Sequence, residues 1–166
     1  LAIFNDSYGA LSLPLAEYLP QIFTDSATAR DAIRRNAAAN GLAGVPSFKE
    51  LGALSEASAD PCFDLVLLKV PKSLSLLEYQ LALMRPRLNP GARLLAAGMS
   101  REIHTATLDA FERLIGPTRT SEAKKKARII YASCAQLPAV AVPGATEYAA
   151  PGVPVPLINL PGVFSR

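Results

Sequence analysis

Tryptophan, histidine and cysteine are scarce in this chain, and each scarcity narrows its possible chemistry. The 166 residues include no Trp, one His and two Cys. His104 has no second histidine beside it and no Cys, Asp or Glu at ligand spacing, so we expect no metal site. A Ser-His-Asp triad would have to use His104 alone. Because His104 precedes a predicted helix, a capping or surface role is a stronger interpretation than catalysis.

Long apolar runs are also absent. No run approaches the roughly 18 residues of a membrane helix, and no basic segment followed by an apolar stretch indicates a secretion signal. Cys62 and Cys134 match no Cys-x-x-Cys pattern and adjoin apolar runs, so we expect buried, reduced thiols in a cytoplasmic protein. The chain starts at Leu1 in a strand-like run and stops at Arg166 without a closing helix. We therefore expect a fragment of a longer protein.

The composition is that of a globular domain, but the charge is uneven. Half of the residues are apolar and 19% are charged. Residues 83–130 contain ten basic and four acidic residues, a net charge of +6, so the remainder of this +3 chain carries −3. A basic half favours a polyanionic partner, although an ordinary solvated face would give the same count.

Short apolar runs alternate with segments of helical period. Strands are predicted at 1–5, 21–24, 45–51, 63–70 and 92–98, and helices at 10–18, 25–39, 73–84 and 107–115. Either Asp25 or Ser26 should cap the second helix, and Ser75 with Glu78 should form a capping box in the third. The run 63–70 is apolar without alternation, which predicts a parallel strand covered on both faces.

This order predicts an α/β fold with a doubly wound, mostly parallel, Rossmann-like sheet. Runs at 119–122 and 128–133 predict a closing antiparallel hairpin around three lysines. From residue 137 onward the chain holds six prolines, which exclude a helix there. We therefore expect one domain over 1–136, followed by extended strands and a linker over 137–166.

The turn after the first strand is where nucleotide-binding α/β folds place a glycine-rich loop. Here it reads Asn5-Asp6-Ser7-Tyr8-Gly9, and only Gly9 is glycine. Side chains at Asn5 and Ser7 should therefore crowd a cofactor. Asp25, at the end of the second strand, could bind a ribose, although a helix cap is the stronger interpretation.

The run 63–72 ends a buried strand with Lys69 and Lys72 on either side of Pro71. Parallel sheets bind ligands at the carboxyl ends of their strands. Two ammonium groups at that position would favour phosphate, or both could simply reach solvent.

Short runs in order along nearly the whole chain resemble one family. They are Asn5-Asp6, Gly9-Ala10-Leu11-Ser12, Lys69-Val70-Pro71-Lys72, Glu102-Ile103-His104-Thr105, Thr107-Leu108, Phe111, Gly116-Pro117-Thr118, Lys125-Lys126-Ala127-Arg128 and Val163-Phe164-Ser165-Arg166. With these runs the chain resembles the N-terminal domain of ribosomal RNA guanine-N2 methyltransferases. It is most similar to the large-subunit branch, with the small-subunit enzymes as near relatives.

The resemblance implies a degenerate methyltransferase-like domain ahead of a C-terminal half that binds S-adenosylmethionine and methylates a guanine amine. That half carries a glycine-rich loop and an Asn-Pro-Pro-aromatic motif, neither of which occurs here. The corresponding position reads Lys69-Val70-Pro71-Lys72, and a lysine cannot accept the hydrogen bonds of the target amine. The resemblance implies that this domain binds no cofactor and holds no catalytic residue. Its expected partners are ribosomal RNA and its own C-terminal domain.

The expected RNA contacts are basic residues near the predicted strand ends. They are Lys69, Lys72, Arg101, Lys124, Lys125, Lys126 and Arg128. Two other functions remain open: a purely structural domain that stabilises the catalytic half, and a small-molecule enzyme with an altered nucleotide pocket around Gly9 and Asp25.

Overall fold

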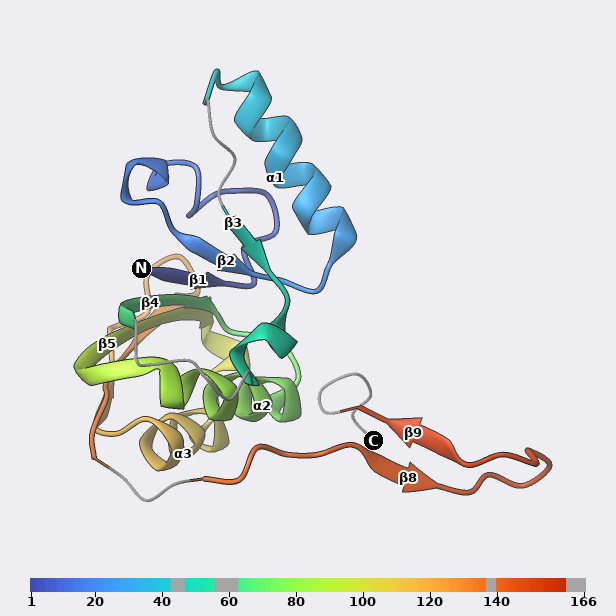
Figure 1. Cartoon of the computed structure of the whole chain (residues 1–166). Helices are drawn as coiled ribbons and strands as arrows, with labels where there is room; N and C mark the ends of the chain where they lie inside the picture. The colour runs from blue at the N-terminus through green and yellow to red at the C-terminus, as the bar shows by residue number, and fades with distance from the viewer. Residues whose placement is uncertain (43–46, 56–62, 137–139, 161–166) are drawn as a thin grey trace.

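The computed structural model describes residues 1–42, 47–55, 63–136 and 140–160, and its centre is one seven-stranded sheet (Figure 1). The strand order is β3-β2-β1-β4-β5-β7-β6. The first five strands are parallel, and β7 runs antiparallel to both β5 and β6. The strands are β1 (Ala2–Phe4), β2 (Gln21–Phe23), β3 (Ser47–Lys49), β4 (Phe63–Lys69), β5 (Leu88–Met99), β6 (Thr118–Thr120) and β7 (Ala127–Ser133). The predicted α/β fold and the closing antiparallel pair are confirmed.

Three α-helices and four short 3-10 helices connect these strands. The α-helices are α1 (Ala27–Ala39), α2 (Leu74–Met84) and α3 (Thr105–Leu114). The 3-10 helices are η1 (Ala16–Tyr18), η2 (Leu51–Ser55), η3 (Arg85–Arg87) and η4 (Ser100–Glu102). Among the described helices, none is long and apolar enough to cross a membrane.

The two faces of the sheet bury different residues. On one face, Phe4, Leu68 and Leu94 pack with α2 and α3, and Figure 1 shows both helices on that side. Strand side chains alternate between faces, so Ile3 points to the opposite side, where α1 buries Ile33 over β1 and β2. The sheet is therefore covered by α2 and α3 on one face and by α1 on part of the other.

The predicted helix at 10–18 is wrong. Apart from the single turn η1, this segment is irregular. The Asp6 carboxylate accepts hydrogen bonds from the backbone N–H groups of Leu11 and Ser12, so these groups are held in a loop rather than at a helix start. The connection from β1 to β2 therefore lacks the helix that a doubly wound sheet usually carries there.

The predicted capping box of Ser75 and Glu78 is also wrong. The side-chain oxygen of Ser73 caps α2 by accepting from the N–H of Leu76 at 3.3 Å, while Glu78 forms an ion pair with Arg113 of α3. Leu74, the first residue of α2, is 39% exposed, whereas Leu77, Leu81 and Met84 at helical spacing along it are buried.

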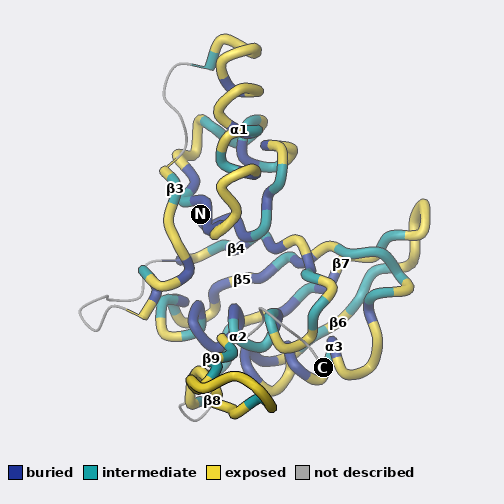
Figure 2. Tube along the Cα trace, turned by 90° about the vertical axis from the view of Figure 1, so that its right-hand side faces the viewer, coloured by how far each residue is buried: buried dark blue, intermediate teal, exposed yellow. Residues whose placement is uncertain are grey.

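Strand β4 is covered on one face only, contrary to expectation. Val66 and Leu68 are buried, whereas Leu65 and Leu67 are half-buried. The physical reason is the placement of α1, which stands over the β1–β2 side of the sheet. Figure 2 shows no described helix over the β5–β7 side opposite α2 and α3.

Beyond residue 136, the described chain forms an antiparallel pair that stands apart from the main sheet (Figure 1). Its strands are β8 (Thr146–Tyr148) and β9 (Leu157–Asn159). This pair agrees with the extended strands predicted for this segment, and Val155 and Ile158 within it are 59% and 66% exposed. Cys62 and the run 163–166 lie outside the described residues.

Candidate functional site

The carboxyl end of β1 is closed by a network of side-chain amides, here called the strand-end network and formed by Asn5, Lys69 and Gln80. The Asn5 amide donates to the Lys69 carbonyl oxygen at 2.9 Å and to Gln80 Oε1 at 2.9 Å. In return, Gln80 Nε2 donates to Asn5 Oδ1 at 2.9 Å. Gln80 lies on α2 and is only 1% exposed. The network therefore joins β1, β4 and α2 at the point where a glycine-rich loop would admit a cofactor.

Asp6 organises the loop that follows. It is 4% exposed, and its carboxylate accepts from the N–H groups of Gly9, Leu11 and Ser12 at 3.1, 3.3 and 2.9 Å. Gly9 has φ +88, and a Cβ there would meet Leu13 at 2.6 Å, so only glycine fits this turn. The backbone donors that phosphate-binding loops offer to a ligand are consumed here by the protein's own carboxylate.

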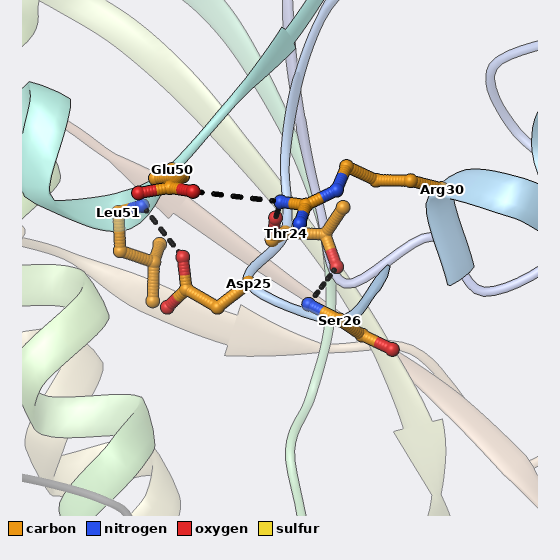
Figure 3. Close-up of polar contacts among 6 residues, drawn as sticks. All are labelled: Thr24, Asp25, Ser26, Arg30, Glu50 and Leu51. Carbon is orange, nitrogen blue, oxygen red and sulfur yellow. Dashed lines mark hydrogen bonds and ion pairs between the residues drawn. The ribbon is translucent and has the colours of Figure 1, made fainter. Parts of the chain in front are cut away.

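Asp25 binds the chain rather than capping α1 (Figure 3). Its carboxylate accepts from the N–H of Leu51 at 3.0 Å, at the start of η2, while Ser26 caps α1 by accepting from Ala29 at 3.2 Å. Arg30 donates to the carbonyl oxygen of Thr24 at 3.2 Å in the same corner. Of the two predicted caps, Ser26 is therefore the correct one for α1. The Asp25 side chain is exposed but already holds a backbone partner.

A cavity of about 340 Å³ lies beside this corner, at the carboxyl ends of β1 and β2. Asn5, Ser7, Tyr8, Thr24 and Ser26 line it among others. Its volume is at the low end of the range for ligand pockets. A small hollow of mixed polar and apolar lining therefore lies near the predicted nucleotide pocket, but neither Gly9 nor Asp25 lines it.

The seven predicted RNA contacts gather along one edge of the sheet, here called the basic edge. Lys69 pairs with Ala97, and Ala97 pairs with Ile129, which puts the ends of β4 and β5 and the start of β7 in one row. Neighbouring strands lie about 5 Å apart, so this row spans roughly 10 Å. All seven side chains are exposed: Lys69, Lys72, Arg101, Lys124, Lys125, Lys126 and Arg128.

Contacts within the edge hold its elements together. The N–H of Ser100 in η4 donates to the carbonyl oxygen of Lys126 at 2.8 Å, which places Arg101 next to the β6–β7 turn. Lys69 Nζ donates to Ser7 Oγ at 3.4 Å, so this lysine also borders the loop after β1. The acidic Glu122 shares the hairpin but leaves the edge predominantly basic.

The turn of the β6–β7 hairpin carries lysines in an unusual backbone conformation. The N–H of Lys124 donates to the carbonyl oxygen of Ala127 at 2.9 Å, and the reverse bond is 3.0 Å, so Lys125 and Lys126 form a two-residue turn. Their φ angles are +50 and +64. Such turns strongly favour Asn-Gly, because other side chains are strained at positive φ. The sequence thus keeps two charged side chains where glycine would be more stable.

The other basic residues of 83–130 lie elsewhere. Arg113 pairs with Glu78, and the Arg119 guanidinium lies 4.7 Å from the centroid of the Tyr131 ring. Arg93 is exposed on the β5 face opposite α2 and α3. The +6 segment is therefore divided between the basic edge and other surfaces rather than forming a single face.

His104 and Cys134 show no arrangement suited to catalysis. His104 is exposed at the start of α3, where its backbone N–H donates to Thr107 Oγ1 at 3.3 Å. Burial raises the pKa of the Cys134 thiol, an effect that Arg85 partly opposes, so the less reactive protonated form is favoured. Cys134 is half-buried rather than fully buried as expected. Over the described ranges, no three His, Cys, Asp or Glu side chains could together hold a metal ion.

Comparison with known proteins identifies the family of this chain. The family model described as the RLMG N-terminal domain matches residues 1–136. The chain belongs to that family. It is also 40% identical, over 172 residues, to Ribosomal RNA large subunit methyltransferase G of Pseudomonas paraeruginosa (strain DSM 24068 / PA7). This alignment covers all of the present chain but 44% of that protein, so the chain spans less than half of its relative's length.

Solved structures show the same methyltransferase-like fold. The T. thermophilus 16S rRNA N2 G1207 methyltransferase (RsmC), in complex with AdoMet and guanosine, superposes with a TM-score of 0.70 at 24% identity. The match covers 99% of this chain and 43% of that one. A predicted O-methyltransferase from Agrobacterium tumefaciens gives 0.63 at 14% identity, covering 80% of this chain and 72% of its own. At these identities the likeness establishes the fold alone.

Two residues of the site were not identified from the sequence. The sequence analysis assigned no role to Gln80, because nothing local indicates that it bonds to Asn5, which lies 75 positions away. Asp6 was noted only as a non-glycine position, although Asp followed by glycine three residues later is a common self-bonded loop. That spacing is the one signal in the sequence that could have revealed its role.

Proposed function

We propose that this chain is the RNA-recognition and scaffolding domain of a longer S-adenosylmethionine-dependent ribosomal RNA guanine-N2 methyltransferase, and that it is itself non-catalytic. Its family and the name of its 40% identical relative support the enzyme class. Residues 1–136 would form the domain, and 137–166 would lead as extended strands and linker to a C-terminal catalytic domain. The cofactor would bind in that second domain, and the whole protein would act in the cytoplasm on ribosomal RNA.

The basic edge is the observation on which this proposal depends. Seven exposed cations lie at the carboxyl ends of the strands, the part of an α/β sheet that binds ligands. An RNA backbone presents one negative charge per nucleotide, and several exposed lysines and arginines can bind such a series of charges without sequence-specific contacts. The edge is therefore suited to a phosphate backbone rather than to a single small anion.

The strand-end network supports the non-catalytic half of the proposal. Asn5 and Gln80 satisfy one another, and the carboxylate of Asp6 occupies the donors of the loop. Binding a nucleotide cofactor here would require breaking these buried hydrogen bonds, each of which costs about 1–3 kcal/mol if left unsatisfied. The loop after β1 thus occupies the position of a cofactor-binding loop, but its polar groups bond to one another instead of to a cofactor.

The test uses charge reversal in the full-length protein. Lys125→Glu with Lys126→Glu should weaken binding to ribosomal RNA at least tenfold and reduce its dependence on salt. The matched control is Arg35→Glu with Lys49→Glu, which changes net charge equally but lies on α1 and β3, at the far end of the sheet. Affinities are measured by fluorescence anisotropy at two or more salt concentrations.

Two results would overturn the proposal. Equal losses for both pairs would mean that net charge alone matters, and no loss for either would leave the purely structural domain as the better account. Isothermal titration of residues 1–166 with S-adenosylmethionine should show no heat of binding. Tight binding of this or another nucleotide in the 340 Å³ cavity would instead favour a small-molecule enzyme.

A further inference from the structure

Among the described residues, no helix covers one largely apolar face of the sheet across β4, β5 and β7. Its residues alternate with the buried ones along each strand and lie in register, with Leu67, Leu95 and Tyr131 in one row. We call it the open sheet face and define it by the following residues: Leu65, Leu67, Leu95, Ala97, Ile129 and Tyr131. All six are half-buried or exposed, and Ile129 is 40% exposed.

Two hollows on this face run into one another. One, of about 490 Å³, is lined by Leu67, Leu95 and Ile129 among others, and the second, of about 820 Å³, by Leu65, Arg93 and Arg119 among others. Leu95 and Tyr131 line both. The face is therefore a continuous groove across three strands, apolar around Leu67 and Ile129 and of mixed polarity around Arg93 and Arg119.

The topology explains why the groove is open. Strands of a parallel sheet are normally covered on both faces by the helices of their crossovers. Here the β1–β2 connection is a loop organised by Asp6, and its residues Tyr8 and Leu11 border the groove without covering it. Over the described ranges, α1 covers only the β1–β2 side (Figure 2). Within the part of the chain that the structure describes, this layer therefore lacks a helix over β4, β5 and β7.

We infer that an amphipathic α-helix from the part of the full-length polypeptide outside residues 1–166 packs into the open sheet face. The relative that is 40% identical to this chain has more than half of its length outside the matched region, so the required length of chain exists. The rim carries more basic than acidic side chains, with Lys69 at one end and Arg93, Arg119 and a single exposed carboxylate, Asp64, at the other. The helix should therefore carry an aliphatic stripe flanked by acidic residues.

The chemistry of the groove favours such a helix over RNA. Surfaces that bind single-stranded RNA present several aromatic rings on which bases stack. The strands of the open sheet face offer one ring, Tyr131, against which Arg119 already lies, and the loop beside them adds only Tyr8 at the border of the groove. Its remaining residues are aliphatic, which suits the side chains of another helix. This inference depends on the chain's family and length, not on RNA binding by the basic edge, so either can fail without the other.

Cysteine labelling in the full-length protein tests this inference. In a background with Cys62 and Cys134 changed to Ser, Ala97→Cys places a thiol on the open sheet face and Ala106→Cys places one on exposed α3. Both are treated with N-ethylmaleimide, and the modified peptides are quantified by mass spectrometry. Without RNA, Ala97→Cys should react at least tenfold more slowly than Ala106→Cys, and the difference should disappear in urea.

Cross-linking, together with the effect of protein concentration on protection, identifies what occupies the open sheet face. A photoreactive maleimide at Ala97→Cys should cross-link to a predicted amphipathic helix outside residues 1–166 of the same molecule. Three outcomes would overturn the inference. The two cysteines could react equally fast, Ala97→Cys could be protected only when RNA is added, or its protection could be lost on dilution while cross-links form between molecules. The last two outcomes would assign the groove to RNA and to a second copy respectively.

Discussion

The strained lysine turn of the β6–β7 hairpin allows effects on stability and on RNA binding to be separated by one double substitution. Lys125→Asn with Lys126→Gly replaces two residues at positive φ with the pair that such turns prefer. Ordinary side chains in this conformation cost about 1–2 kcal/mol each relative to glycine. Because asparagine relieves only part of that cost, we expect the hairpin to gain about 1 kcal/mol.

This gain should be visible in local hydrogen exchange in the full-length protein. The amides of Lys124 and Ala127 are bonded to each other's carbonyl groups across the turn. A gain of about 1 kcal/mol corresponds to roughly fivefold slower exchange for amides that open with the hairpin. Amides of α1, which does not contact the hairpin, should exchange at unchanged rates and serve as the internal reference.

The same double substitution should weaken RNA binding although it stabilises the hairpin. If both lysines contact phosphates, their removal lowers the steepness of the salt dependence, the slope of log affinity against log salt, by about 1.4–1.8. Arg35→Gln with Lys49→Gln removes two charges at the far end of the sheet and should leave that slope nearly unchanged.

Two outcomes would refute this reasoning at different points. A hairpin that becomes less stable with Asn-Gly would show that the turn geometry is not the one described. A hairpin that becomes more stable while affinity and salt slope stay constant would show that the lysines are retained for a reason other than RNA. Only slower exchange together with weaker, less salt-dependent binding supports the proposal.

Two further predictions concern the strand ends. Asp6→Ala removes the acceptor of three loop N–H groups and should lower the free energy of unfolding by about 3 kcal/mol, measured by urea denaturation; a loss below about 0.5 kcal/mol would mean that the loop is held by other contacts. Gln80→Leu removes the donor to Asn5 Oδ1 and one of the two acceptors of the Asn5 amide, and should cost about 1–3 kcal/mol; a cycle with Asn5→Gly should show coupling of about 0.5–3 kcal/mol. Additive effects in that cycle would contradict the bonded pair.

Local sequence patterns predicted most of the elements but not all of their boundaries. The helix α1 follows from Ser26 as a cap and from apolar residues at helical spacing, both of which depend on neighbours within one or two turns. The segment 10–18 carried a similar pattern, yet it forms a loop because Asp6 binds its N–H groups. A nearby side chain that competes for backbone donors can thus override periodicity.

The sequence by itself determined the α/β class, the loss of the glycine-rich loop, the basic character of residues 83–130 and the family. Each of these depends on residue type and order alone. Only the tertiary structure decided that Asn5 meets Gln80, that Asp25 bonds to Leu51, that seven cations share one edge, and that one face of the sheet stays open. These features join residues far apart in the chain. They depend on strand register and on which face of the sheet each connection crosses, and neither can be predicted from the local sequence.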